Sequence, residues 1–538
     1  MNTGQLWNLS LGFLGIQIAY ALQSANASRI FSIIGISSTA LSYFWILPPL
    51  LGMFVQPLVG KYSDRTWCRF GRRLPYLILG TVVAMAMAIL LPNAGVFGFS
   101  LSTATLFCAM TLMFMDTSLN TSMQPYKMLV GEMVNERQKG RAYSIQSLIC
   151  NVGSATGFML PFLLGWFGLS MTAPEGEVPA VVSVSFYIGA AMLLLCMIYS
   201  LLKIKEWNPR EYARYNPQPG GEVKNPGMLK LLRRAPSTFW SVGLVQFFNW
   251  FGFLFMWTYC TGTVAQNTFH TPAVEKVTSI EAAGSRLETA DKVILNSAGE
   301  VVLDHGRDSE GLFAKLPSPA ELTICSRVKH DRETGAVIPI EYERVIVPDI
   351  HNANVTTELR PDASSELYSE AGNWVGVLYA VQAIGSVLWA LVLPRFRSRK
   401  FSYGISMAIG AAGFVLSGII SDKWLLFIPY MMIGTAWAAS MAWPFAFLTD
   451  SLKGRDVGSY MGLFNCTICL PQIVAALCGG LLLGMMTQPG ELAPQYMMMI
   501  LAGVSLAFGA IAVTFIKDPL KRGPEPVADP VIGEGGVY

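Results

Sequence analysis

An acid, an amide and an amine share one face of an otherwise apolar segment in the first half of the chain. Asp116 follows the apolar run 106–115, and Asn120 and Lys127 follow Asp116 after four and eleven residues. At about 100° per residue, these spacings bring the three side chains to one side of a helix. A carboxylate at the centre of a membrane helix costs ~2.5 kcal/mol or more, and it is kept where it faces a protein interior or a water-filled cavity. The stripe could exchange a proton and bind a polyhydroxylated solute. The alternatives are a buried structural pair and a lysine that reaches toward the membrane surface.

Amides and aromatic rings on other apolar segments could complete a sugar site, which needs both. Gln17 and Gln23 lie about 120° apart on a helix with Tyr20 between them, so both need not face one cavity. Asn249 and Trp257 are eight positions apart and share a face, whereas Trp250 is offset. Helix packing is the alternative for each residue. The candidates for sugar binding are Gln17, Tyr20, Gln23, Asn120, Lys127, Asn249, Trp250, Trp257, Asn465 and Gln472.

The elements that carry these residues have the composition of a helical membrane protein. The chain has 538 residues, of which 52% are hydrophobic and 14% are charged, whereas soluble domains carry about 25% charged residues. Its long uncharged runs predict about twelve membrane helices. The predicted spans are 8–26, 38–59, 75–94, 102–129, 142–166, 181–203, 237–262, 373–394, 401–420, 425–448, 457–485 and 494–516.

Basic residues are sorted between the loops. Lys and Arg cluster in the loops after the even-numbered predicted spans, and the short loops on the other side hold only Arg29 and Lys423. Because cytoplasmic loops carry the excess of Lys and Arg, we expect both termini in the cytoplasm. The expected location is the inner membrane of a bacterium.

A short repeat divides the chain into related halves. Lys139-Gly140-Arg141 precedes the fifth predicted helix, and Lys453-Gly454-Arg455 precedes the eleventh. We therefore expect two pseudo-repeat bundles of six helices each. The expected parts are an N-terminal bundle (1–203), a cytoplasmic linker (204–236), helix seven (237–262), an insertion outside the cytoplasm (263–372), the rest of the C-terminal bundle (373–517) and a cytoplasmic tail (518–538).

The insertion has a different character from the rest of the chain. Its segments 292–295, 301–303 and 342–347 alternate as strands do and predict short strands. All four histidines lie in it, so a proton relay in the membrane part must use carboxylates. A metal site formed by these histidines and Cys325 fits no usual ligand spacing. We expect no metal and no cofactor.

A loop motif that contains Gly60, Asp64, Arg65, Gly71, Arg72 and Arg73 follows the second predicted helix. Glycines allow a tight turn there, and an acid among arginines can form ion pairs that break when one bundle moves against the other. This loop resembles the signature of the major facilitator superfamily. We expect a gating role for Gly60, Asp64, Arg65, Gly71, Arg72 and Arg73, with Glu132 as a contact of Arg72 or Arg73.

A closer resemblance covers most of the membrane part. The chain is similar to the sucrose-type proton symporters of the glycoside–pentoside–hexuronide group, which includes the plant sucrose transporters. The matching residues are Gly15-Ile16-Gln17 and Ala21-Leu22-Gln23 in the first helix, 54–60 with Asp64-Arg65 and 71–75 at the second, Asp116, Asn120, Gln124, Pro125, Lys127 and Gly131-Glu132 in the fourth, and Gly462, Asn465, Pro471 and Gln472 in the eleventh. The insertion matches no part of this pattern and looks more like a bacterial variant.

The resemblance implies roles for particular positions. Asp116 falls on the acid that the group protonates during symport. Lys127 stands where the group usually has Arg, which keeps the charge but loses a planar, bidentate donor. Glu132 replaces an Asp. Melibiose-type members hold sodium with acids of the second helix, but 38–59 has no Asp or Glu. Since a hard cation prefers several oxygen ligands, proton coupling is favoured.

The sequence therefore predicts a proton-coupled symporter that imports an α-glucoside disaccharide such as sucrose or maltose by alternating access. Its partners would be the sugar, the proton and the bilayer, with no nucleic acid, and we expect a monomer. A sodium- or proton-coupled carrier of another glycoside, pentoside or hexuronide is one alternative. A membrane sugar sensor is another. An enzyme is not expected, because clustered acids or histidines at a membrane face are absent from the sequence pattern.

Overall fold

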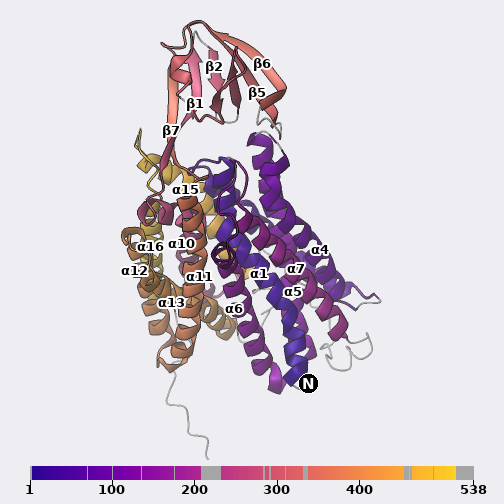
Figure 1. Cartoon of the computed structure of the whole chain (residues 1–538). Helices are drawn as coiled ribbons and strands as arrows, with labels where there is room; N and C mark the ends of the chain where they lie inside the picture. Colours follow the sequence, from indigo (N-terminus) through magenta and orange to yellow (C-terminus); the bar gives the residue numbers. More distant parts are fainter. Residues whose placement is uncertain are drawn as a thin grey trace, which may run out of the picture.

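The structure is a computed structural model that describes residues 3–68, 71–97, 99, 101–134, 136–174, 176–206, 232–282, 285–289, 292–308, 311–330, 337–452, 460, 463–488 and 490–516. Helices dominate it, and a small β insertion stands at one end of the helical body (Figure 1). Each of the twelve predicted spans falls on a helix within these residues. The predicted all-α membrane fold with a β-containing insertion is confirmed.

Two sets of helices form the membrane part. The N-terminal set is α1 (Thr3–Ile34), α2 (Leu41–Phe44), α3 (Leu47–Arg65), α4 (Leu74–Leu90), α5 (Leu101–Met133), α6 (Glu136–Trp166) and α7 (Ala180–Lys203). The C-terminal set is α10 (Ser237–Asn267), α11 (Glu366–Val392), α12 (Arg399–Ile419), α13 (Phe427–Leu452), α15 (Cys466–Met486) and α16 (Gln495–Ala512).

Nine helices of the described part are long and apolar enough to cross a membrane. Helices α1, α3 and α5 are not among them. Polar side chains lower the hydropathy of α1 and α5, and these include Gln23 and Asp116 of the candidate site. The spans 8–26 and 102–129 were nevertheless predicted on α1 and α5, because apolar runs flank these polar residues.

Several predicted helix boundaries were wrong. Helix α10 continues past residue 262 to Asn267, and α11 begins at Glu366, so both ends of the predicted insertion 263–372 are helical. The second predicted span is split, because Pro48 and Pro49 start α3 anew after the short α2. The first helix does not end at residue 26 but continues to Ile34. Arg29, expected in a loop, is a fully buried residue of α1. Its two terminal nitrogens donate hydrogen bonds to the other bundle, which a sequence pattern does not reveal.

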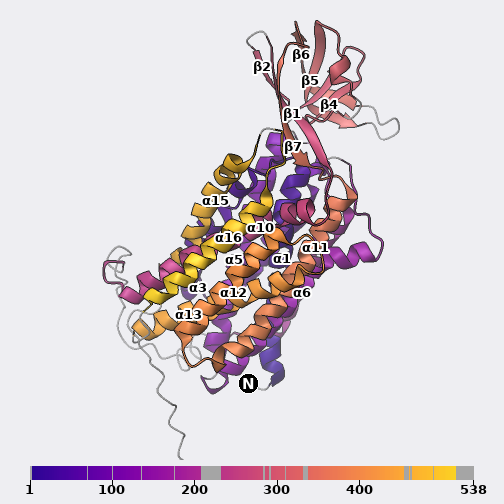
Figure 2. The ribbon, with the colours of Figure 1, turned by 90° about the vertical axis from the view of Figure 1, so that its left-hand side faces the viewer.

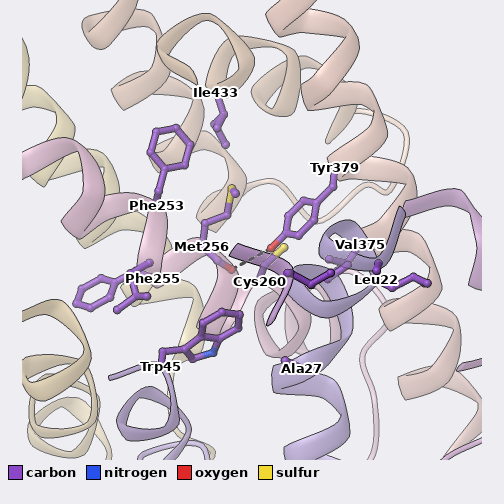
Figure 3. Close-up of a cluster of buried hydrophobic side chains, with 14 of the residues drawn as sticks. Leu22, Ala27, Trp45, Phe253, Phe255, Met256, Cys260, Val375, Tyr379 and Ile433 are labelled. Carbon is purple, nitrogen blue, oxygen red and sulfur yellow. Dashed lines mark hydrogen bonds between the residues drawn. The ribbon is translucent and has the colours of Figure 1, made fainter. Parts of the chain in front are cut away.

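Apolar side chains of both bundles pack into one core. Figure 3 shows Leu22 and Ala27 of α1 beside Val375 and Tyr379 of α11 and Cys260 of α10. The Tyr379 hydroxyl donates a hydrogen bond to the Met256 carbonyl, 3.2 Å away. Trp45, which follows α2, belongs to the same cluster. The bundles are therefore in close contact near the ends of α1, α10 and α11.

The insertion consists of seven strands: β1 (Ala273–Ala282), β2 (Ser285–Glu288), β3 (Val293–Asn296), β4 (Val301–Asp304), β5 (Ala320–His330), β6 (Val337–Val347) and β7 (Asn354–Pro361). They pair antiparallel in two sheets, with orders β2-β1-β7 and β4-β3-β5-β6. The three predicted strands correspond to β3, β4 and part of β6. The other four strands were not predicted, although Ala320, Leu322 and Ile324 of β5 alternate with polar residues and are buried.

Strands β1 and β7 form the stem of the insertion. β1 follows α10 and β7 precedes α11, so both ends of the insertion attach to the C-terminal bundle (Figures 1 and 2). β7 also contacts the N-terminal bundle, because Arg360 donates a 2.6 Å hydrogen bond to the carbonyl of Gly35, next to the end of α1. The insertion thus touches both bundles at one end of the molecule.

Candidate functional site

The carboxylate of Asp116 is the centre of the candidate site. It is buried on α5, and both of its oxygens accept hydrogen bonds from amides. Gln23 of α1 donates to Oδ1 at 3.0 Å, and Asn120, one turn on along α5, donates to Oδ2 at 2.8 Å. Among the described side chains no cation pairs with Asp116. Because the described groups that bond this carboxylate are neutral, taking up a proton would remove a buried charge without breaking an ion pair among them.

Tyr20 and Cys469 lie near this carboxylate. Tyr20 is a half-buried residue of α1, and its hydroxyl interacts electrostatically with both Asp116 and the thiol of Cys469 on α15. Asn465, at the start of α15, donates to the sulfur of Cys469 at 3.7 Å. Cys469 therefore brings a residue of the C-terminal bundle into the neighbourhood of Asp116.

The two glutamines of α1 do not share a site. Gln17 accepts a 3.2 Å hydrogen bond from Ser154 of α6, so its amide serves contacts inside the N-terminal bundle. Gln23 reaches Asp116, and its Oε1 is buried without a hydrogen-bond partner. The predicted angular separation of the two side chains is confirmed. The expected place of Gln17 in the sugar site finds no support in its contacts.

Aromatic rings from both bundles form a second cluster around Trp257. The Trp257 ring of α10 lies 6.3 Å from Trp45 of the N-terminal bundle, 6.3 Å from Trp250 and 6.1 Å from Trp437 of α13. Phe253 lies 5.0 Å from Trp437. The rings of Trp257 and Trp437 are half-buried, so each keeps an accessible edge or face. Such rings can pack against the apolar face of a sugar.

Several buried polar atoms of α10 lack partners. Ser440 of α13 donates to the Asn249 side-chain oxygen at 2.9 Å, but Asn249 Nδ2 has no hydrogen-bond partner among the residues that the structure describes. The same holds for Trp250 Nε1 and for both amide atoms of Gln246. Since an unpaired buried polar group costs about 1–3 kcal/mol, water or a polar solute would be expected to bind there.

The residues of the C-terminal bundle split into two groups. Asn249, Trp250 and Trp257 lie together on α10, whereas Asn465 and the half-buried Gln472 lie on α15, which packs against α10. Gln472 has no hydrogen bond to another described residue. Neither Trp437 nor Cys469 was among the predicted binding residues. Trp437 joins the site through its ring contact with Trp257 of another helix, and Cys469 through the approach of the two bundles.

The loop between α3 and α4 is organised by an acid that the sequence did not single out. Glu206, just after α7, accepts backbone hydrogen bonds from Arg72 at 2.7 Å, Arg73 at 2.9 Å and Leu74 at 2.8 Å. These are free N–H groups at the start of α4, where a negative charge is favoured. Gly71 has φ +112°, and a Cβ there would come within 2.8 Å of the Glu206 carboxyl carbon. The predicted need for glycine at position 71 is confirmed.

The two arginines of this loop have separate contacts. The Arg73 guanidinium donates to the Ser63 hydroxyl of α3, and the Arg72 guanidinium lies over the Trp67 ring at 5.7 Å. The side chains of Asp64, Arg65, Lys127 and Glu132 and the surroundings of Gly60 lie outside the described residues, although their backbones belong to α3 and α5. The predicted contact of Glu132 with Arg72 or Arg73 therefore stays a prediction.

Within the described part of the chain, no group of three His, Cys, Asp or Glu residues could hold a metal ion. His305 of the insertion contacts Asp304, with 2.7 Å between Nδ1 and Oδ1. Cys325 is buried in the insertion, where burial raises the pKa of its thiol.

Comparison with known families agrees with this architecture. Residues 28–261 match the family described as MFS/sugar transport protein, and residues 356–533 match the Major Facilitator Superfamily. Together they cover most of the chain, and the unmatched segment between them contains most of the β insertion. The chain belongs to the major facilitator superfamily.

Relatives within this superfamily include plant sucrose transporters. The sucrose transport protein SUT1 of Oryza sativa subsp. japonica is 25% identical over 278 residues, which span 48% of this chain and 52% of that protein. The sucrose transport protein SUT5 of Oryza sativa subsp. indica is 23% identical over 490 residues, or 87% of this chain and 79% of that protein. The alignment with SUT1 thus spans about half of its length. The predicted resemblance to this group is confirmed.

Solved structures of the superfamily share the fold. The D-xylose-proton symporter superposes with a TM-score of 0.59 at 13% identity, covering 95% of this chain and 97% of that one. The nucleoside transporter NupG gives a TM-score of 0.59 at 13% identity, covering 95% and 99%. These similarities support the arrangement of the helices.

Proposed function

We propose that this protein is a proton-coupled symporter that imports an α-glucoside disaccharide such as sucrose or maltose by alternating access. The observation that carries the proposal is the buried Asp116 carboxylate, held by the amides of Gln23 and Asn120 without a cation among the described residues. A carboxylate in this setting is easily neutralised by one proton. A sodium ion would need more oxygen ligands than one acid and its amides provide.

The sugar would bind between Asp116 and the tryptophan cluster. Gln23 Oε1, Asn249 Nδ2 and Trp250 Nε1 are buried atoms without partners, so they could hydrogen-bond sugar hydroxyls without giving up an existing bond. Trp257 and Trp437 offer ring surface beside them. The names of the rice relatives, which are sucrose transport proteins, support a disaccharide.

In the proposed cycle, protonated Asp116 allows sugar to bind from outside. Release of the proton to the cytoplasm returns the negative charge and favours unloading. The insertion would lie outside a bacterial inner membrane, with both termini in the cytoplasm. The hydrogen bonds between the bundles on the insertion side would then close the outer entrance in this conformation.

Transport in reconstituted vesicles tests this function. Purified protein in proteoliposomes would be given radiolabelled sucrose, maltose, a pentoside or a hexuronide, under either an inward proton gradient or an inward sodium gradient. We expect accumulation of a disaccharide driven by protons alone. Accumulation that requires sodium, or flux of only a pentoside or hexuronide, would refute the proposal, and binding without flux would indicate a sensor.

A further inference from the structure

The guanidinium of Arg29 is buried between the two bundles, next to the insertion. Arg29 lies on α1, and its side chain is 0% exposed. Nη1 donates to Asn373 Oδ1 at 2.8 Å, and Nη2 donates to the Ser369 carbonyl at 3.0 Å and to its hydroxyl at 3.1 Å. Both partners belong to α11. One side chain of the N-terminal bundle is therefore held entirely by acceptors of the other bundle.

This charge has no counter-ion in the part of the chain that the structure describes. The three acceptors are neutral, and Nε of Arg29 is buried without a partner. Burying a cation is unfavourable unless hydrogen bonds replace its hydration. The contact of Arg29 with α11 thus combines an unfavourable desolvation with three favourable hydrogen bonds. The desolvation and the hydrogen bonds exist only while α1 and α11 are in contact.

The packing of α11 is shaped around this guanidinium. A Cβ at Gly372 would come within 2.6 Å of Cδ and Nε of Arg29. Asn373 also contacts the N-terminal bundle with its amide nitrogen, which lies 3.6 Å from the sulfur of Met171. Close approach of α1 and α11 therefore depends on Gly372, and orientation of the arginine depends on Asn373.

Further hydrogen bonds between the bundles lie at the same end. Gln495 of α16 donates to Ser38 at 2.9 Å, and the Gly480 amide of α15 donates to Ser42 at 2.9 Å. These pairs join uncharged groups. Arg29 differs from them because separation of the bundles would return its charge to water.

We propose that Arg29 is a positioning residue that sets the balance between the states closed and open on the insertion side. Desolvation of its guanidinium opposes closure of the two bundles. The hydrogen bonds to Asn373 and Ser369 stabilise the closed state and offset that desolvation. Loss of an acceptor therefore favours opening, because the charge stays buried with fewer partners. Loss of both the charge and the acceptor restores closure, since an apolar pair has no desolvation to offset. The inference rests on the proposed alternating access with the insertion outside.

Cysteine labelling from outside tests the proposal without any sugar. The reporter is Ala25→Cys, because Ala25 is buried one turn from Arg29 on the same face of α1. The reagent is a membrane-impermeant maleimide applied to intact cells, and protein without the reporter gives the background. We expect Asn373→Leu to speed labelling about tenfold or more, as loss of a hydrogen bond to a buried charge predicts. The pair Arg29→Met with Asn373→Leu should return the rate to within about twofold of the parent.

Controls separate the possible failures. Ala298→Cys, on an exposed turn of the insertion, should label from outside, and its failure would refute the proposed orientation and function rather than the role of Arg29. Asn26→Leu is matched to Asn373→Leu in residue type and burial. The Asn26 amide donates within its own helix, to the Leu22 carbonyl, so labelling should not change.

A second acceptor variant guards against misfolding of the first. Ser369→Ala should also speed labelling, and it replaces Asn373→Leu if that variant does not reach the membrane. An unchanged rate in both acceptor variants, or no restoration by the double variant, would overturn the inference.

Discussion

Gln23 and Asp116 are 93 residues apart in the chain, and the amide nitrogen of Gln23 lies 3.0 Å from the carboxylate Oδ1 of Asp116. This contact ties α1 to α5 at the one acid that the sequence places in the middle of an apolar segment. It leaves Gln23 Oε1 unpaired beside the carboxylate. Proton and sugar could therefore influence each other through a single amide.

Replacing the acid should separate transport from coupling. We expect Asp116→Asn to abolish accumulation of sugar against a gradient, because the side chain can no longer exchange a proton. Exchange of labelled for unlabelled sugar at equilibrium should persist, since that process needs no net proton movement. Both are measured in proteoliposomes. Full uphill uptake by a folded Asp116→Asn protein would contradict the coupling role.

The two glutamines of α1 provide a matched comparison. Gln23→Leu removes a hydrogen bond to a charged group, and we expect kcat/KM for uptake to fall about tenfold or more, since such a bond contributes about 1.5–3 kcal/mol. Gln17→Leu removes only the bond with Ser154 and should change uptake less than about threefold. Initial rates over a range of sugar concentrations would show the difference. Equal losses in the two variants would argue against a special role for Gln23.

Trp257 should contribute ring surface to the sugar. We expect Trp257→Ala to weaken sugar binding about tenfold, which corresponds to a loss of ~1.4 kcal/mol of contact. Trp257→Phe should retain most of the affinity, because a flat ring remains. Binding of labelled sugar to purified protein measures this. Trp424, 60% exposed on the insertion side, is the control, and Trp424→Ala should leave affinity unchanged.

The driving ion has a predicted signature. Uptake should rise as the outside is made more acidic, because a higher proton concentration favours protonated Asp116 on that side. A protonophore should abolish accumulation, and replacement of sodium by potassium should have no effect. Flow dialysis or filtration of cells with labelled sugar measures each case. Stimulation by sodium at constant pH would show that another ion drives transport.

Glu206 should stabilise the loop between α3 and α4. We expect Glu206→Ala to lower the free energy of unfolding by about 1–2 kcal/mol, as for loss of a helix cap, because three backbone amides lose their acceptor. Thermal unfolding in detergent measures the effect. Its exposed neighbour gives a control, and Lys205→Ala should leave the melting temperature unchanged. A Glu206→Ala protein as stable as the parent would refute this cap.

The sequence alone predicted the parts of this protein that depend on local composition. Long apolar runs predicted the helices, and three alternating segments of the insertion predicted three of its strands. The spacing of Asp116 and Asn120 predicted their contact, because residues four apart on a helix are neighbours. Gly71 was among the glycines that predicted a tight turn in the loop after the second helix.

The tertiary structure decided which residues meet across helices. It paired Gln23 with Asp116 and Gln17 with Ser154, placed Cys469 near Asp116, and attached Glu206 to the start of α4. Arg29 is the clearest case, because its charge suggested a loop and only the acceptors of α11 explain its burial. Helical periodicity fixes the direction of a side chain relative to its own axis. The partner on another helix depends on how the bundles pack, and no local pattern encodes that.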